Sequence, residues 1–183
     1  ITIRDLHDTH AKIACVSLLI QTSTMEKKYK ILFVCLGNIC RSPAAEGILQ
    51  KLLQKAKLSE NIEVDSAGTY GGHAGELPDS RMRAHAARRG YKLTHRSRQI
   101  KWDDFEKFDL ILGMDDTNIS NLQRLAPDPE SLAKIRRTTD FFRKLPYDHI
   151  PDPYYSGSDG FELVLDILED ACNGLIEELK NRK

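Results

Sequence analysis

The stretch that most constrains the fold runs from Ile31 to Gly47, where an apolar run meets a loop and a helix start. Residues 31–34 are Ile, Leu, Phe and Val, which favour a buried strand. Ser42 and Pro43 are typical of a helix N-cap and first helical position, and apolar residues then recur at helical spacing. The sequence therefore predicts a strand, a tight loop and a helix in immediate succession.

This succession predicts an anion-binding site, because backbone N–H groups of the loop and the positive end of the helix can point at one ligand. Gly37 and Asn38 best tolerate the backbone angles that such a loop needs. Arg41 offers a planar fork for two phosphate oxygens. Cys35 stands at the mouth of the loop, where these positive groups favour its thiolate. A thiolate beside a bound phosphate is a nucleophile aimed at phosphorus.

A cysteine at the end of a strand is, taken alone, more often a small buried residue than a nucleophile. Here Cys35 is followed by five residues, Arg41 and a Ser-Pro helix start, and no Walker-type GxxxxGK[ST] motif is present. The string CLGNICRSPAAEG directly after the first strand resembles the low-molecular-weight protein tyrosine phosphatase family. The resemblance covers roughly residues 29–180.

The resemblance implies roles for the loop and for residues beneath it. Cys35 is expected to be the nucleophile and Arg41 to bind phosphate. The other expected substrate- and phosphate-binding residues of the loop are Leu36, Gly37, Asn38, Ile39, Cys40 and Ser42. Of these, Asn38 would hold the loop through side-chain hydrogen bonds, and Ser42 would donate one to the Cys35 thiolate. The resemblance also implies a supporting network of His95 and Asp115, and neither a metal nor a cofactor.

Cys40 lies in the same loop as Cys35. The resemblance implies that the two can form a reversible disulfide under peroxide, which would protect the nucleophile from further oxidation. The alternative is a small residue chosen for packing.

The candidate general acid is Asp152 in the segment Pro151-Asp152-Pro153-Tyr154-Tyr155. Two flanking prolines stiffen the segment, and the tyrosines can raise local hydrophobicity and stack on an aryl substrate. An exposed turn with incidental tyrosines is an equal alternative from the residues alone. The resemblance favours the acid, since Asp-Pro followed by aromatics is the general-acid motif of the family, with both tyrosines lining the cleft. In some members of the family this tyrosine pair is itself phosphorylated, so the resemblance also offers a regulatory role for Tyr154 and Tyr155.

The rest of the chain predicts an α/β fold, a small sheet of about four parallel strands with helices on both faces. Further strands are expected near residues 62–68, 109–114 and 133–136, and helices near 79–89, 102–107, 118–125 and from Asp159 onward. Pro127–Pro129 is expected to be a loop, and Glu162 to form a capping box with Asp159. The Gly-rich segment 69–78 is expected beside the phosphate loop. There, Gly72 falls where mammalian members of the family carry a Trp, with Tyr70 nearby.

The composition limits the kind of protein and its compartment but does not indicate a function. The 183 residues carry 27 basic and 27 acidic side chains and four cysteines, which suits a single globular domain in a reducing compartment. Residues 81–101 contain eight Lys or Arg and no Asp or Glu. In residues 159–178 the only charged side chains are those of Asp and Glu. Two solvated helix faces are expected, with a basic face for anionic substrates as the alternative. Residues 1–24 are expected to be an extension outside the fold, and the apolar run within them is too short to span a bilayer. Residues 25–183 are expected to form a single phosphatase domain.

Two relatives on the same fold are the main alternatives. Arsenate reductases coupled to thioredoxin need further cysteines after the second strand, and residues 66–110 contain none. Phosphoarginine phosphatases tend to have Thr where this chain has Ile39, and lack the paired tyrosines. A silent phosphate-binding module would have lost Cys35, Arg41 or Asp152. We therefore predict a cytoplasmic phosphotyrosine phosphatase acting on a protein substrate, with a tyrosine kinase as a candidate partner and no nucleic acid or membrane.

Overall fold

The apolar run that begins at Ile31 forms the centre of a parallel sheet in the computed structural model, which describes residues 27–181. The strands are β1 (Tyr29–Cys35), β2 (Ile62–Gly68), β3 (Leu110–Gly113) and β4 (Ile135–Arg137). Their order is β2-β1-β3-β4, and all neighbouring pairs are parallel. The predicted fold class is confirmed.

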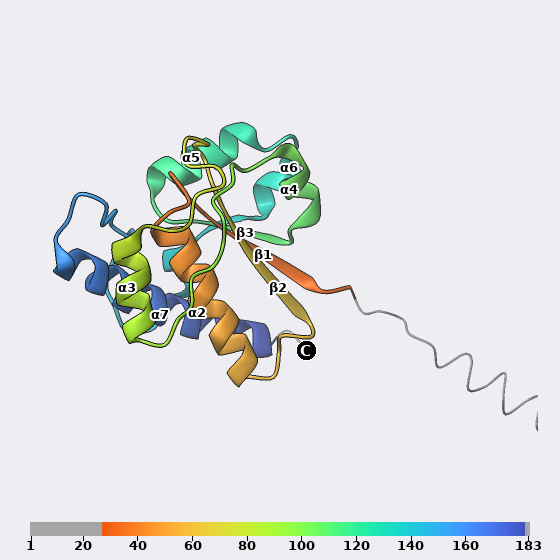
Figure 1. The fold of residues 1–183 in the computed structure, drawn as a ribbon. Coiled ribbons are helices and arrows are strands. Elements are labelled where there is room, and N and C mark those ends of the chain that lie inside the picture. The colour runs from red at the N-terminus through yellow and green to blue at the C-terminus, as the bar shows by residue number, and fades with distance from the viewer. Residues whose placement is uncertain (1–26, 182–183) are drawn as a thin grey trace, which may run out of the picture.

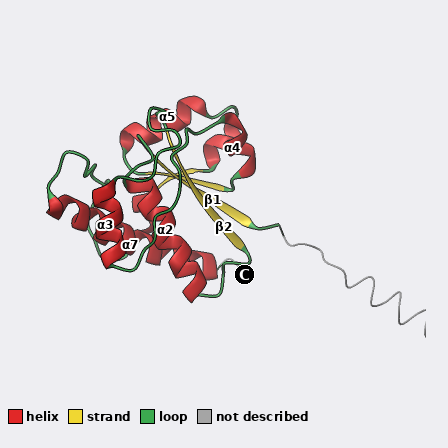
Figure 2. Cartoon of the chain, in the orientation of Figure 1, coloured by secondary structure: helices red, strands yellow, loops and turns green. Residues whose placement is uncertain are grey.

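Helices cover both faces of this sheet (Figures 1 and 2). The helices are α2 (Arg41–Lys55), α3 (Ser80–Arg88), α4 (Trp102–Lys107), α5 (Asp116–Leu125), α6 (Pro129–Ala133) and α7 (Ser158–Lys180), with a 3₁₀ turn, η1, at Thr138–Phe141. One layer consists of α2, α3 and α7, and the other contains α4, α5 and α6. Successive side chains of β1 alternate between them: Phe33 belongs to the core under α2 and α7, and Leu32 to the core under α4 and α5. A strand buried on both faces needs the continuous apolar run that the sequence shows.

Some local predictions were wrong. The fourth strand begins at Ile135, because Asp128 accepts a hydrogen bond from the Ser131 amide and starts helix α6 within the expected loop and strand. The first helix begins at Arg41, before Ser42, whose hydroxyl has other partners.

The last helix begins at Ser158 after Gly157, without the capping box expected from Asp159. Glu162 instead contacts His85 and Arg89 of the neighbouring basic segment.

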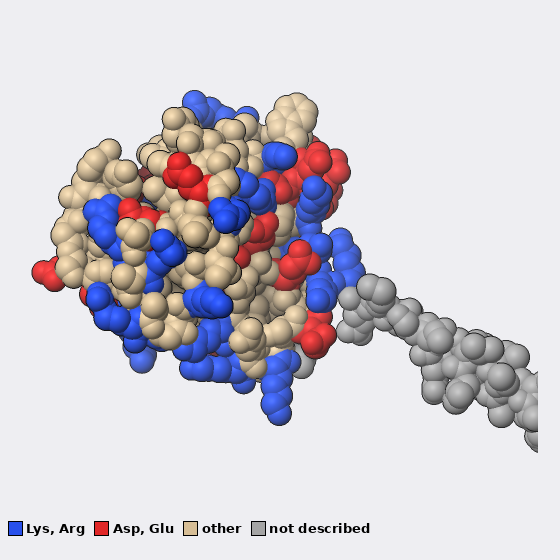
Figure 3. Space-filling model, viewed as in Figure 1, with Lys and Arg blue, Asp and Glu red and all other residues tan. Residues whose placement is uncertain are grey.

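The basic and acidic stretches are therefore partners as well as solvated surfaces. Arg89 bonds the carboxylates of Glu162 at 2.5 Å and Asp166 at 2.7 Å, and Tyr91 donates to Glu169 at 2.9 Å. These contacts attach the α3 segment to α7. Basic side chains are also prominent over α2 and α3 on the face in Figure 3. The prediction of two merely solvated faces is corrected accordingly.

No helix within residues 27–181 combines the length and apolar character needed to cross a membrane. The predicted extension, residues 1–24, lies outside the described residues.

Candidate active site

The loop between β1 and α2, here called the phosphate loop (residues 35–41), lies at the floor of a cavity of about 230 Å³. The carboxyl ends of parallel strands meet at this edge of the sheet, where open α/β folds bind ligands. The cavity is lined by Cys35, Leu36, Gly37, Ile39, Cys40, Arg41, Tyr70, His73, Asp152, Tyr154 and Tyr155. The predicted Asn38, Ser42, His95 and Asp115 do not line it.

Cys35 lines this cavity, and the residue is only 3% exposed. Its Sγ lies 3.0 Å from the Ser42 hydroxyl and accepts a hydrogen bond from the Asn38 amide at 3.3 Å. The backbone N–H of Asn38 and the Ser42 side chain therefore hold the position of the sulfur.

Asn38 connects the phosphate loop to the structure beneath it. Its φ of +55° is in the left-handed region that Asn tolerates, and its side chain is fully buried. The nitrogen of its side-chain amide, Nδ2, donates to the hydroxyls of Ser42 and Ser66, both at 2.9 Å. Its Oδ1 accepts from the Arg98 amide at 2.9 Å and lies 3.1 Å from His95 Nε2. Since the Arg98 amide needs an acceptor there, Nε2 of His95 must carry the hydrogen and donate it.

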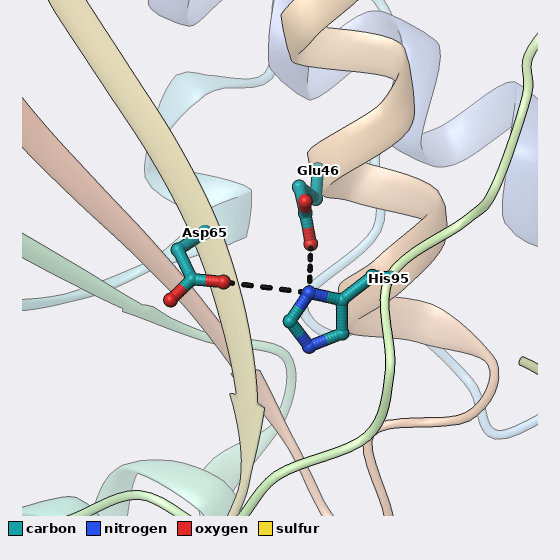
Figure 4. A group of neighbouring side chains, drawn as sticks. All are labelled: Glu46, Asp65 and His95. Carbon is teal, nitrogen blue, oxygen red and sulfur yellow. Dashed lines mark ion pairs between the residues drawn. The ribbon is translucent and has the colours of Figure 1, made fainter. Parts of the chain in front are cut away.

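The other ring nitrogen of His95 faces two carboxylates (Figure 4). Nδ1 lies 3.2 Å from Glu46 and 3.4 Å from Asp65. Burial raises the pKa of Glu46 to about 7, although the hydrogen bond from Ser66 opposes the shift. Burial also lowers the pKa of His95, against the charge of Asp65. Among the described residues these three form the group with metal-ligand spacing. Because these residues contact one another and His95 bonds Asn38, they support the phosphate loop from beneath.

Arg41 joins the phosphate loop to two distant carboxylates. It is 3% exposed, and its Nη1 donates to Asp115 at 2.6 Å and to the Ile150 carbonyl at 3.1 Å. Its Nη2 donates to Asp152 at 3.0 Å. Burial alone would lower the pKa of Arg41, but the charges of Cys35, Asp152 and Asp115 outweigh it and raise the pKa. Asp115 also caps α5 by accepting from the Asn118 amide, so its position is fixed.

Asp152 lies on what we call the acid loop (residues 151–157), and it lines the same cavity as Cys40 and Ile39. Its side chain is 43% exposed, and its Oδ1 accepts from the Tyr154 amide at 3.1 Å. The rings of Tyr154 and Tyr155 meet edge to face at 5.0 Å, and Tyr155 is 95% exposed. The predicted acid and tyrosines therefore lie at the same cavity as the cysteine.

Cys40 is buried in the same loop and, like Cys35, is a free thiol. Burial, followed by the negative charges of Asp79 and Cys35, raises its pKa far above the usual range. Cys40 is therefore a neutral thiol at physiological pH.

Two further cavity residues were not among the predicted site residues. Tyr70 turns its ring over Gly72, so that a Cβ at Gly72 would lie 2.2 Å from the ring. The aromatic wall therefore comes from Tyr70, and Gly72 leaves room for it. His73 bonds Glu76 at 2.8 Å and lies next to Gly37. The tyrosine followed by two glycines was the available sequence signal for this arrangement.

Sequence reasoning also missed the residues beneath the loop. Glu46 and Ser66 are buried polar residues on α2 and β2, and Ser66 donates to Glu46 at 2.7 Å. A polar side chain at a position where the pattern expects an apolar one was the signal for them.

These features define a class of protein: a parallel α/β fold with an anion-binding loop after its first strand, a buried cysteine in that loop and a buried arginine closing it. The family model "Low molecular weight phosphotyrosine protein phosphatase" matches residues 30–183. Low molecular weight phosphotyrosine protein phosphatase 1 of Drosophila melanogaster is 43% identical over 150 residues, covering 81% of this chain and 96% of the relative. The chain therefore belongs to the low molecular weight phosphotyrosine protein phosphatase family, and the predicted enzyme class is confirmed.

Solved structures agree with this assignment. A crystal structure of protein tyrosine phosphatase from Entamoeba histolytica has a TM-score of 0.82 and 45% identity, covering 84% of this chain and 98% of the other. A drosophila arginine phosphatase is also similar, with a TM-score of 0.77 and 34% identity, covering 82% and 98%.

Proposed function

We propose that this protein hydrolyses phosphotyrosine in protein substrates through a cysteinyl-phosphate intermediate. The observation that carries the proposal is that Cys35, Arg41 and Asp152, which are far apart in the sequence, line one cavity. They supply a nucleophile, a fixed positive charge and a proton donor, which are the groups that this chemistry requires.

In the first step the Cys35 thiolate attacks phosphorus, forming the S–P bond as the P–O bond to the phenol breaks. Asp152, protonated, gives its proton to the leaving phenolate oxygen. Arg41 and the backbone N–H groups of the phosphate loop stabilise the charge on the equatorial phosphate oxygens. A bound phosphate would take Nη2 of Arg41 from Asp152, since the guanidinium fork suits two phosphate oxygens.

In the second step Asp152, now a carboxylate, accepts a proton from water as the water oxygen attacks the cysteinyl-phosphate. The S–P bond breaks, and inorganic phosphate leaves. The Ser42 hydroxyl, 3.0 Å from Sγ, stabilises the departing thiolate.

The aromatic rim supports an aryl substrate. Tyr70, Tyr154 and Tyr155 line the cavity and can contact the face and edge of a phenyl ring. The substrate is then a phosphotyrosine-containing protein, with a tyrosine kinase among the candidates, and the three free buried thiols support a cytoplasmic location. Residues 25–183 form the phosphatase domain in this proposal.

Phosphoarginine is the second candidate substrate, because the drosophila arginine phosphatase is a structural neighbour at 34% identity. Ile39 lines the cavity, and its apolar side chain offers no hydrogen bond to a guanidinium group. The aromatic rim together with Ile39 favours phosphotyrosine.

The test is hydrolysis of p-nitrophenyl phosphate, a phosphotyrosine peptide and a phosphoarginine peptide in the presence of EDTA. Wild type is expected to hydrolyse the first two, Cys35→Ser to be inactive, and Asp152→Ala to be about 100-fold slower. Faster turnover of phosphoarginine than of phosphotyrosine would overturn the substrate assignment. An unimpaired Asp152→Ala variant would overturn the assignment of the acid.

We also propose that Cys40 protects Cys35 by forming a reversible disulfide with it under peroxide. Wild type inactivated by peroxide is expected to recover with thiol, and Cys40→Ala to recover much less. Full recovery of Cys40→Ala would contradict this role.

A further inference from the structure

We propose that Arg81, at the start of α3, is a positioning residue that holds the acid loop so that Asp152 faces the reacting phosphate. The inference rests on the proposed role of Asp152 as general acid. Its basis is a chain of contacts that runs from the phosphate loop through Asp79 and Arg81 to Tyr154.

The first part of this chain fixes the guanidinium of Arg81 relative to the phosphate loop. The Asp79 amide donates to the Ile39 carbonyl at 2.8 Å. The Asp79 carboxylate then accepts from Arg81 Nε at 3.1 Å and from Nη2 at 2.8 Å. It also accepts from the Arg81 amide at 2.8 Å and so caps α3. A two-point fork on a capping carboxylate leaves the guanidinium little freedom to turn.

The second part connects Arg81 to the acid loop. Nη2 donates to the Tyr154 carbonyl at 3.1 Å. Among the described residues, this is the hydrogen bond that reaches residues 153–157 from a distant part of the sequence. The guanidinium also lies 5.5 Å from the ring centre of Tyr154 and 4.9 Å from that of Phe161 on α7. Arg81 is therefore in contact with both the acid loop and the helix that follows it.

The third part leads from Tyr154 to the acid. The Tyr154 amide donates to Oδ1 of Asp152 at 3.1 Å, so the peptide that precedes the held carbonyl orients the carboxyl group. At the other end, the Ile150 amide donates to the Met114 carbonyl at 2.8 Å, which anchors the start of the acid loop. Arg41 bonds the Ile150 carbonyl and the Asp152 carboxylate, and Arg81 is the anchor that holds the segment after Asp152.

The expected consequence is selective. Proton transfer requires the donor within hydrogen-bond reach of the leaving oxygen, and a small displacement costs much of the rate. Phosphate binding depends on Arg41 and the phosphate loop, which Arg81 does not hold. A loosened acid loop should therefore slow the release of basic leaving groups, which need the proton, more than that of weakly basic ones.

The experiment compares kcat/KM for phenyl phosphate and p-nitrophenyl phosphate in wild type, Arg81→Met and Arg81→Lys. Met keeps an apolar stem against Tyr154 and Phe161 but removes every donor, whereas Lys keeps a charge without the planar fork. We expect Arg81→Met to lose about 10-fold on phenyl phosphate and about 2-fold on p-nitrophenyl phosphate. Arg81→Lys should fall between this variant and wild type. Arg88→Met is the matched control, since Arg88 is on the same helix and bonds Glu162 of α7; it should leave both values unchanged.

Equal losses on the two substrates, or no loss, in a variant that melts as wild type does would overturn the positioning role. Arg81→Lys serves as the test if Arg81→Met does not fold.

Asp152→Asn separates this inference from the proposed function. If Asp152→Asn itself shows no dependence on the leaving group, the assignment of the acid fails and this inference with it. If it shows that dependence and the Arg81 variants do not, only this inference fails. In the Asp152→Asn background, Arg81→Met should add no further selectivity.

Discussion

The phosphate loop and the acid loop face each other across one cavity, yet they are held in different ways. The phosphate loop is buried except at Leu36 and Gly37, and Asn38 bonds four partners from α2, β2 and the segment before α4. The acid loop is more exposed: the side chain of Asp152 is 43% exposed and Tyr155 is 95% exposed. Among the described residues, the hydrogen bonds that it receives from distant parts of the sequence come from Arg41 and Arg81.

In the proposed mechanism, this difference corresponds to two tasks. Stabilising charge on a phosphate requires donors that are already in place, so that no reorganisation accompanies the reaction. Delivering a proton to varied leaving groups requires only that one carboxyl group come within reach, and an exposed loop also leaves the substrate a way in. Arg41 belongs to the phosphate loop and bonds Asp152 of the acid loop, so in the proposed mechanism a phosphate that engages Arg41 changes the contacts of Asp152 as well.

Arg41→Lys tests the connection between the two loops and is expected to have the largest effect. An ammonium group cannot reach Asp115, Asp152 and two phosphate oxygens with fixed geometry. We expect kcat/KM for p-nitrophenyl phosphate to fall about 1,000-fold, as when a preorganised donor is lost. Steady-state kinetics measure this. A loss below about 10-fold would mean that the backbone N–H groups suffice without the guanidinium fork.

Asn38→Ala tests whether the phosphate loop depends on its buried support. The change removes the hydrogen bonds that the Asn38 side chain makes with Ser66, with His95 Nε2 and with the Arg98 amide, and so should cost about 1–3 kcal/mol of unfolding free energy. We expect kcat/KM to fall about 100-fold through misplacement of the loop. Urea denaturation and kinetics on one preparation check both. Wild-type kinetics in this variant would show that backbone geometry alone holds the loop.

Tyr155→Ala tests the opposite expectation for the acid loop. The side chain is 95% exposed, so the melting temperature should stay within about 2 °C of wild type. We expect KM for a phosphotyrosine peptide to rise about 3–10-fold, with little change for an alkyl phosphate, because the ring contact is lost. Calorimetry and kinetics test this. A large drop in melting temperature would contradict the contrast between the two loops.

Glu46→Gln tests the pH dependence of the support and should have the smallest effect on activity. Burial raises the pKa of Glu46 from 4.5 to about 7, so between these pH values the folded state binds more protons than the unfolded state. The unfolding free energy of wild type should then decrease as pH rises through this range, by about 1–3 kcal/mol. Glu46→Gln should lack that decrease, while a variant at the exposed Glu63 should keep it. Urea denaturation from pH 4.5 to 8 measures this. If the unfolding free energies of wild type and Glu46→Gln changed with pH in the same way, Glu46 would not be the source of the pH dependence.

Much of the fold could be predicted because the signals are local. A run such as Ile31–Val34 and the periodic pattern of α7 each identify an element from neighbouring residues alone. Boundaries were less accurate where a cap competed with the pattern: Asp128 begins a helix inside an expected loop, and Glu162 pairs with Arg89 instead of capping. The Asp128 cap uses the nearby Ser131 amide, whereas the partner of Glu162 is distant in the sequence.

The sequence by itself determined the phosphate loop of this protein, because strand, loop, Cys35, Arg41 and helix start are adjacent and their chemistry follows from their order. The tertiary structure alone decided what surrounds it. Asp115 and Asp152 lie 74 and 111 residues from Arg41, and Arg81 lies 73 from Tyr154. Such contacts arise because parallel strands bring their carboxyl ends to one edge of the sheet, where the loops that follow them meet. Tyr70 over Gly72 is a local contact by comparison, but only the folded loop places that ring at the cavity.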